Sequence, residues 1–431
     1  AVNFGATGSA SWVTTVKTTD FTAVAGEGYF VNTTGGEIDV TLPAGTAGAV
    51  VAVADYANNF ATANCILKQN GSDKIEGSTD DLVINQEGVS ITLVFVDSTK
   101  GWVTTDTGNS TNVFVSPSIT ATGGTITTVN CGACKVHTFT APGTFCVSAI
   151  AGNAANNEIS YMIVGGGGGA GSNQNPGGPG GSGGGGAGGF REVKSPVTPY
   201  TASPLDGYGT PGNRVTVTAT AFPIVVGSGG AGGPSFNNGT IGVNSTAFSK
   251  TSAGGGSGGK SGPGGSPPGN LGSPGGAGGS GGAGGGSPGT SGSGGAGNTP
   301  PVSPSQGFAG GSGATGGYGG GSGGGATVVG YNAVSSPAGN PDAPTKSTGA
   351  TTSINGSPTA FAGGGGGGGW CGGTAPGNVG GAGGGGQGSF GPFPAGGSTA
   401  TAGTANTGGG GGGVFNSSGV TGKNGGSGIV I

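Results

Sequence analysis

The stretch Gly275–Gly286 reads GGAGGSGGAGGG, with glycine pairs separated by single small residues at Ala277, Ser280 and Ala283. A Gly/Ser-rich segment of this kind is commonly a flexible linker. A strict period of three residues, however, matches a helix of the polyproline-II type, which has three residues per turn and leaves its backbone N–H and C=O groups unpaired. The stretch therefore predicts either a disordered tether or a wall of packed glycine helices.

Packed helices of this type can pair their backbone groups only where no Cβ lies between them. In a G-G-x repeat, two edges of each helix are bare backbone and the third edge carries a side chain. We expect a two-layer wall whose x residues face outward. Collagen is excluded because the glycines come in pairs and the chain holds only 26 prolines. The large entropy that glycine loses on ordering keeps the tether alternative open.

The same pattern recurs along the second half of the chain, where most of the 116 glycines lie. Polyglycine-II segments are predicted at about 165–189, 253–298, 310–326, 362–386 and 407–413. Apolar strands precede the glycine segments, and the chain ends on the short apolar run GIVI. The expected fold is a glycine-rich domain over 131–431, bracketed by strands at about 135–164, 213–227 and 428–431.

The first part of the chain has the composition of a globular β-domain. Runs such as VSITLVFVD alternate apolar and polar residues, as half-buried strands do. We predict a small β-sandwich or jelly-roll-like domain over 17–105. Residues 1–16 are expected to be an N-terminal arm and 106–130 a Thr/Ser/Gly-rich connector. The predicted fold class is all-β throughout.

Charge and hydropathy exclude several classes of partner. Charged residues make up 6% of the chain, the net charge is −4, and no Lys/Arg cluster occurs, so nucleic-acid binding is not expected. No apolar run reaches the length of a membrane span, so membrane insertion is not expected either. The N-terminus lacks a basic region followed by an apolar core, from which we expect synthesis in a cytosol without a signal peptide.

Five cysteines are present, and Cys131 and Cys134 form a C-x-x-C pair. A local disulfide between them, or two small buried residues, is the first interpretation. Zinc binding would need further ligands such as His137 and Cys146. Redox chemistry would need a βαβ context that the sequence lacks. No metal and no cofactor is predicted.

The sequence offers no constellation for catalysis, and we expect no enzyme. The single histidine, His137, lies in an alternating strand pattern. Asp39, Asp80 and Asp81 could supply one half of a glycosidase acid pair, but nothing positions a second carboxylate. Exposed surface acids are the simpler interpretation.

Aromatic residues are sparse in the glycine-rich half, which has no deep core to absorb them all. Some are expected to pack under loops or at the ends of the bundle. Others are candidates for contacts with sugar or protein surfaces, because Tyr and Trp are effective contact residues. The receptor-binding candidates are Phe308, Tyr318, Tyr331, Phe361, Trp370, Phe390 and Phe393.

Several blocks of sequence resemble a known family. EISYMIVGGGGGAGS at 158–172, GGGGAGGFREV at 183–193 and the terminal GGSGIVI are similar to the glycine-rich domain of bacteriophage tail-fibre and related virion proteins. The stretch from GEGYFVNTTGGEIDVTLP to GWVTT, within 17–105, is similar to a module of phage tail fibres, including those of marine cyanobacterial phages.

The resemblance implies a virion fibre or adhesin that is assembled in the infected cytoplasm. Its loops would bind a host surface polysaccharide or outer-membrane protein. Fibres of this kind are usually homotrimers that attach to other virion proteins. The alternative is a purely structural virion protein, such as a head fibre or decoration protein, without a receptor role. An ice-binding or cell-wall protein is a third class.

Overall fold

The computed structural model describes residues 10–107, 118–129, 134–173, 180–262, 271–316, 319–334, 347–369, 379–390, 399–415 and 421–431. The chain divides into two compact units: Ala1–Thr120 with Ser148–Asn157 (unit 1), and Ala121–Val147 with Glu158–Ile431 (unit 2). Helical structure in the described residues is limited to two short 3-10 helices, η2 (Ala154–Asn157) and η3 (Pro211–Asn213). The predicted all-β class is therefore confirmed.

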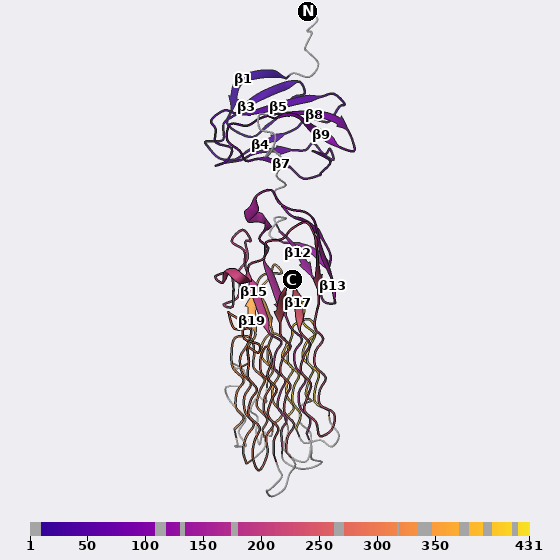
Figure 1. The fold of residues 1–431 in the computed structure, drawn as a ribbon, viewed down its shortest axis with the longest axis vertical. Coiled ribbons are helices and arrows are strands. Elements are labelled where there is room, and N and C mark those ends of the chain that lie inside the picture. The colour runs from indigo at the N-terminus through magenta and orange to yellow at the C-terminus, as the bar shows by residue number, and fades with distance from the viewer. Residues whose placement is uncertain are drawn as a thin grey trace, which may run out of the picture. The chain divides into compact units, whose positions relative to one another are not determined.

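Unit 1 contains two sheets that enclose an apolar core (Figure 1). The first sheet has the order β1 (Ser11–Lys17), β3 (Glu27–Val31), β5 (Val50–Asp55), β8 (Ser90–Asp97) and β9 (Gly101–Thr107). The second has the order β2 (Phe21–Thr22), β4 (Ile38–Thr41), β6 (Cys65–Lys68) and β7 (Leu82–Ile84). The alternating apolar residues face inward, and Leu67, Leu93 and Trp102 are fully buried. Because every second residue of most strands is buried, the two sheets pack face to face as a sandwich.

The strands of unit 1 are connected differently from those of an antiparallel jelly roll. The chain alternates between the two sheets from β1 to β6, and the pairs β1–β3, β3–β5, β2–β4 and β4–β6 are parallel. Only the pairs β5–β8, β8–β9 and β6–β7 are antiparallel. All but the last residue of strand β1 lies within 1–16, where an arm was expected, and the pairing of β1 with β3 makes it part of the sandwich.

Unit 2 begins with small sheets at one end. Strand β14 (Tyr161–Val164) lies between β15 (Phe190–Val193) and β21 (Ile429–Val430), so the last residues of the chain close a sheet. The other strands are β10 (Thr120–Thr122), β11 (Thr125–Val129), β12 (Cys134–Thr138), β13 (Gly143–Ala149), β16 (Ala221–Ile224), β17 (Ser245–Ala247), β18 (Lys250–Ser252), β19 (Ala350–Thr352) and β20 (Thr359–Phe361). Strands β10 and β11 lie inside the range expected to be a connector.

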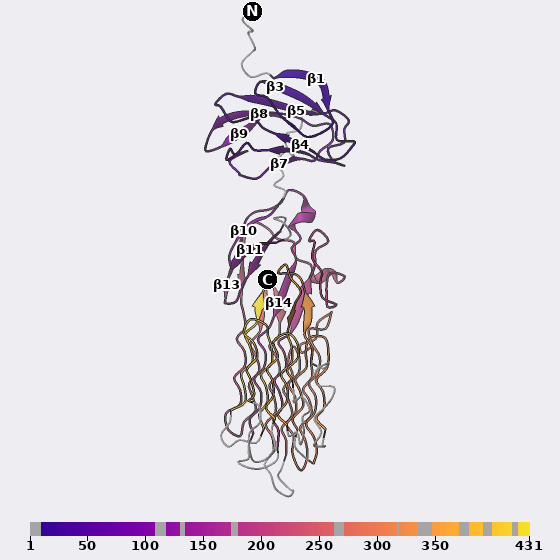
Figure 2. The ribbon, with the colours of Figure 1, turned by 180° about the vertical axis from the view of Figure 1, so that it is seen from behind.

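An apolar cluster fills this end of unit 2, which we call the sheet end. Met162, Val164, Phe190, Phe361 and Ile429 are its largest fully or nearly fully buried members. The glycine segments start here and run to the opposite end of the unit, which we call the distal end (Figures 1 and 2). Segments such as 165–173 and 181–189 directly follow or precede strands of this end, β14 and β15, which fixes their register.

Backbone hydrogen bonds between segments hold the bundle together, and segment 181–189 shows the pattern. The N–H groups of Ser182, Gly183 and Gly184 donate to the carbonyl oxygens of Val414, Gly259 and Gly321, and those of Gly185, Gly186 and Ala187 to Gly411, Gly256 and Gly324, at 2.8–3.1 Å. Successive N–H groups thus donate to the same three neighbouring segments in the same order, and this order repeats every three residues. Carbonyl groups of this segment accept from three further segments, at 165–171, 280–286 and 365–368. A helix with three residues per turn produces this period; the polyproline-II conformation itself stays a prediction.

The close approach of these backbones explains the glycines. A Cβ at Gly185 would lie 2.0 Å from the carbonyl oxygen of Gly168, and one at Gly184 would lie 2.2 Å from that of Gly365. Neither neighbour is a flexible side-chain end, so a side chain at these positions would force two backbones apart. The bundle therefore requires glycine for its hydrogen bonds to form.

Two details of the expected wall are corrected. The x residues of interior segments face inward, since Ser182, Ala187, Ser280 and Ala283 have no exposed surface. The stretch Gly275–Gly286 is also not one straight helix, because the chain bends at 278–280 and the part after the bend runs antiparallel to the part before it. The bundle has interior segments with neighbours on all sides, which a two-layer wall would lack.

Candidate functional site

The distal end of the bundle is closed by small polar side chains. The backbone N–H of Asn237 donates to Ser172 Oγ at 2.9 Å, and Ser261 Oγ donates to Asn173 Oδ1 at 2.8 Å. Asn173 Nδ2 in turn donates to the carbonyl oxygen of Gly180 at 2.8 Å. Ser172, Asn173 and Ser261 are all buried. Their side chains take up backbone groups where the segments end, as caps do elsewhere.

A second set of contacts continues this layer across the bundle. Phe415 pairs with Gly181, and its N–H donates to Ser389 Oγ at 2.8 Å. Gly369 donates to the carbonyl oxygen of Ser389 at 3.0 Å and pairs with Gly319. Residues that are distant in sequence thus meet in one layer at this end.

Large apolar side chains are exposed at the same end. Phe236, Leu271 and Val334 are exposed by 47%, 60% and 48%, and Phe390 is half-buried. Exposed apolar residues that occur singly are ordinary on protein surfaces, but several at one end indicate a contact area.

Phe236 occupies an unusual backbone position. The N–H of Asn237 donates to the carbonyl oxygen of Pro234 at 3.0 Å and closes a turn in which Phe236 has φ +69°. Glycine or asparagine is the favoured residue in this left-handed region, and an aromatic residue is disfavoured there by about 1–2 kcal/mol. Strain of this size at an exposed residue is typical of functional positions. Phe236 was not among the predicted contact residues, although its place in GGPSFNNG, between two glycine segments, was a visible signal.

The predicted aromatic contacts occupy different environments. Phe361 is buried in the sheet-end cluster, and Tyr331 is 4% exposed, with its N–H donating to Ser322 Oγ at 2.9 Å. Phe308 is half-buried next to Gly325, close to the sheet end, so of the described candidates only Phe390 lies at the distal end. Tyr318, Trp370 and Phe393 lie outside the described residues.

The predicted disulfide pair is described only in part. Cys134 is a free, half-buried cysteine in β12, and Cys131 lies outside the described residues. Among the other cysteines, burial raises the pKa of the Cys65 thiol, which makes it unreactive. His137 Nδ1 lies 2.8 Å from the carbonyl oxygen of Gly123, and its ring packs edge-on against Phe145.

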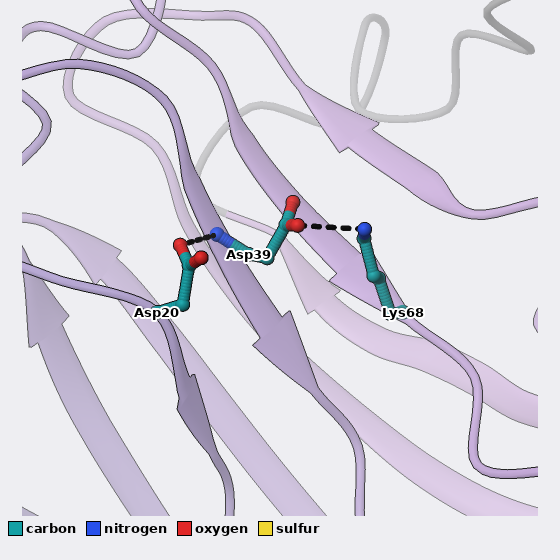
Figure 3. Close-up of polar contacts among 3 residues, drawn as sticks. All are labelled: Asp20, Asp39 and Lys68. Carbon is teal, nitrogen blue, oxygen red and sulfur yellow. Dashed lines mark hydrogen bonds and ion pairs between the residues drawn. The ribbon is translucent and has the colours of Figure 1, made fainter.

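The acids considered for catalysis have structural contacts. Asp39 Oδ2 lies 2.6 Å from Lys68 Nζ, and the backbone N–H of Asp39 donates to Asp20 Oδ1 at 2.8 Å (Figure 3). The hydrogen bond to Asp39 raises the pKa of Lys68. Asp80 is exposed and accepts a hydrogen bond from Ser78 Oγ at 3.0 Å. These contacts link strands and turns.

Glu192 is a buried acid at the sheet end. The Glu192 carboxylate is 2% exposed and accepts hydrogen bonds from the Ser203 N–H at 2.8 Å and from Thr352 Oγ1. Burial, and next the charge of Glu192, raises the pKa of Tyr200. These bonds connect β15 to the loop that follows it and to β19. Glu192 therefore acts as a structural link.

Within the described part of the chain, no group of three or more His, Cys, Asp and Glu side chains is arranged to hold a metal. None of the helices described is both long and apolar enough to cross a membrane.

Comparison with known proteins gives one finding. The sequence model of a family described as "Glycine-rich domain" matches residues 139–431, which include every glycine segment of unit 2. No curated protein matches the chain.

Proposed function

Given that the chain belongs to this glycine-rich domain family, we propose that it is a non-catalytic virion fibre protein whose distal end contacts a host surface. The bundle would act as a stiff support and the distal end as the contact area. The virion assignment is supported by the resemblance of residues 17–105 and of the glycine-rich blocks to phage tail-fibre sequences. Assembly in the host cytoplasm and attachment to other virion proteins belong to the same proposal.

One observation carries the contact role, namely the exposed and strained Phe236. A turn that served only to connect two segments would be more stable with glycine at φ +69°. The phenyl ring instead occupies this position at the end where Leu271 and Val334 are also exposed. Strain retained at an exposed aromatic residue is expected where the ring makes contact with a partner.

A rigid support suits recognition. Contact residues placed on rigid elements lose little conformational entropy on binding. The host molecule would be an outer-membrane protein or a surface polysaccharide.

The test measures adsorption of the labelled full chain to intact cells of a panel of bacterial strains. Phe236→Gly is expected to reduce adsorption at least about tenfold while raising stability by about 1 kcal/mol, because the strain is relieved. Phe236→Tyr should keep adsorption near the wild-type level, since it keeps the ring. Val197→Ser, which removes an exposed valine of the loop after β15, is the control and should have no effect.

Two results would overturn the proposal. One is unchanged adsorption of the Phe236→Gly chain to a strain that binds the wild type. The other is the absence of wild-type adsorption to every strain of the panel, which would favour the purely structural virion role.

A further inference from the structure

Trp12 is an aromatic residue that unit 1 leaves on its surface. It lies in the edge strand β1 and is 42% exposed. In the neighbouring strand β3, Tyr29 and Val31 belong to the core. Successive side chains of a strand alternate between its two faces, so Gly28 and Phe30 lie on the outer face of the sheet. Trp12 is paired with Gly28 and therefore lies on this outer face as well.

The indole ring of Trp12 lies flat on the outer face. A Cβ at Gly28 would lie 2.9, 3.0 and 3.2 Å from the ring atoms Cδ2, Cε3 and Cε2, so the face of the ring occupies the space of the missing side chain. The Phe30 ring lies beside it, with the two centroids 4.9 Å apart and the planes inclined by 31°. Glycine weakens a strand interior and commonly marks the close approach of another group. Here it allows an aromatic ring to lie on the backbone with its other side open to solvent.

Hydroxyl groups lie on the same face within reach of this ring. Ala52 of β5 is paired with Gly28, and Thr92 of β8 is paired with Ala52. Thr92 is thus two strand spacings from Gly28, which is about 10 Å. Ser90 is the next outward residue of β8, and both hydroxyl-bearing residues are half-buried. A ligand stacked on Trp12 can therefore meet apolar and hydroxyl groups together.

The face around Trp12 is uncharged. The outward positions of β1, β3, β5 and β8, counted in steps of two from Trp12, Gly28, Val50 and Ser90, hold no charged residue in the described strands. A nucleic acid does not suit this surface, because its phosphates need cations.

The charged residues at the ends of β1 and β3 are held on the core side of the sheet. Both contact Tyr29: the Lys17 ammonium lies 5.6 Å from its ring centroid, and Glu27 Oε2 accepts its hydroxyl hydrogen at 2.6 Å. They therefore do not compensate the absence of charge on the outer face, and an uncharged ligand matches it best.

We propose that Trp12 and Phe30 form a binding platform for an uncharged polysaccharide. A pyranose ring has a face of C–H groups and a rim of hydroxyl groups. The C–H face would pack on the open side of the indole, which offers a large apolar area, and the hydroxyl groups would reach Ser90 and Thr92. Proline-rich peptides also bind aromatic residues, but they dock into grooves between them. The Trp12 and Phe30 rings pack against each other and leave no such groove.

A third aromatic residue extends the platform. Tyr56 directly follows β5, is 57% exposed, and donates its backbone N–H to the carbonyl oxygen of Val31 at 2.9 Å. It is thus next to the end of β3, close to Phe30 in the sheet. A ligand of several sugar units is therefore expected to bind more tightly than a single sugar. This platform lies in unit 1 and does not depend on the host contact at the distal end.

The test is calorimetric titration of the full chain with a panel of neutral gluco-, manno- and galacto-oligosaccharides. At least one member should bind. Trp12→Ala is expected to reduce its affinity at least about tenfold, because the stacking surface is lost. Trp12→Tyr keeps an aromatic ring and should lose less.

A glycine pair separates the position of the ring from its presence. Gly28→Ala puts a methyl group where the ring lies, so Trp12 must move, and the affinity should fall at least about fivefold although the indole is retained. Gly35→Ala, also in unit 1, would place a Cβ with no atom within 4 Å and should keep the wild-type affinity. Because Trp12 lies at a sheet edge and is able to move aside, both variants should fold.

Three results would overturn this inference. They are the absence of binding to every member of the panel at millimolar concentration, an unchanged affinity of the Trp12→Ala chain, and tighter binding of an oligogalacturonate or a polyproline peptide than of any neutral oligosaccharide. Phe236→Gly should leave the oligosaccharide affinity unchanged. The sugar platform and the host contact can therefore fail independently.

Discussion

The two units of this chain are stabilised by different interactions. Unit 1 buries large side chains such as Phe60, Leu67 and Trp102 between two sheets. The glycine bundle of unit 2 buries Gly, Ala and Ser, and the interaction that recurs along its segments is a backbone hydrogen bond between them. The first unit depends on apolar area removed from water, the second on the pairing of main-chain groups. The difference shows that a sequence with little apolar content can still specify a packed interior.

The largest expected effect is that of adding one methyl group inside the bundle. Gly185→Ala would place a Cβ 2.0 Å from the Gly168 carbonyl oxygen, and two backbones would have to separate. We expect a loss of more than about 4 kcal/mol, or failure of unit 2 to fold. Thermal unfolding followed by circular dichroism measures this loss.

The matched control for this substitution is Gly209→Ala. A Cβ at Gly209 would meet no atom within 4 Å. Stability should change by less than about 1 kcal/mol. Equal effects of the two substitutions would mean that the bundle does not depend on close backbone contact.

The next effect concerns the side-chain core of unit 1. Leu93 is fully buried, and Leu93→Ala should cost about 2–5 kcal/mol, because it removes apolar contacts and leaves a cavity. Calorimetry should show a lower transition temperature for unit 1 and an unchanged transition for unit 2. A shift of both transitions would contradict the claim that the side-chain core of unit 1 and the glycine bundle of unit 2 are stabilised independently.

A smaller expected effect is that the stability of unit 1, but not that of the glycine segments, depends on pH in the alkaline range. Burial raises the pKa of Tyr29 in unit 1 to about 12, with its hydroxyl donating to Glu27 Oε2 at 2.6 Å. An unfolded tyrosine titrates near pH 10, so the unfolded state loses its proton first as the pH rises. Tyr29 thus contributes stability below about pH 10 that is lost as the pH approaches about 12.

Urea unfolding of unit 1 at pH 9 and pH 11.5 measures this dependence. Tyr29→Phe should reduce the difference between the two values. Segments 165–173 and 181–189 contain no titratable side chain, so a change of pH should alter the exchange of their amides only through its effect on the intrinsic exchange rate. A pH-independent unit 1 would mean that the Tyr29 hydroxyl is not held as described.

Local patterns predicted a large part of this fold. The apolar runs that became β5, β8, β14 and β21 were visible because side-chain alternation or continuous apolarity marks strands. The glycine segments were visible from their period of three. Strand β1 was missed because half of its residues are exposed at a sheet edge, so its sequence lacks the pattern of a buried strand.

Other features depend on contacts that are distant in sequence. The bend at 278–280 has no proline or asparagine to mark it, and glycine can reverse direction wherever neighbouring segments require it. Whether an x residue faces inward, as Ala283 does, or outward, as Ala277 does, depends on how many segments surround it. The distal position of Phe236 follows from the same packing, and so sequence alone did not single it out.

The central claim is that backbone hydrogen bonds order the glycine segments, and amide hydrogen exchange tests it most directly. The N–H groups of Gly183, Gly184, Gly185 and Gly186 all donate to neighbouring segments. In the folded full chain they should exchange at least about 1,000-fold more slowly than in an unfolded peptide, which corresponds to local opening that costs roughly 4 kcal/mol or more. Exchange of these four amides at the rate of an unfolded peptide would contradict the account. The glycine segments would then be better described as a flexible tether.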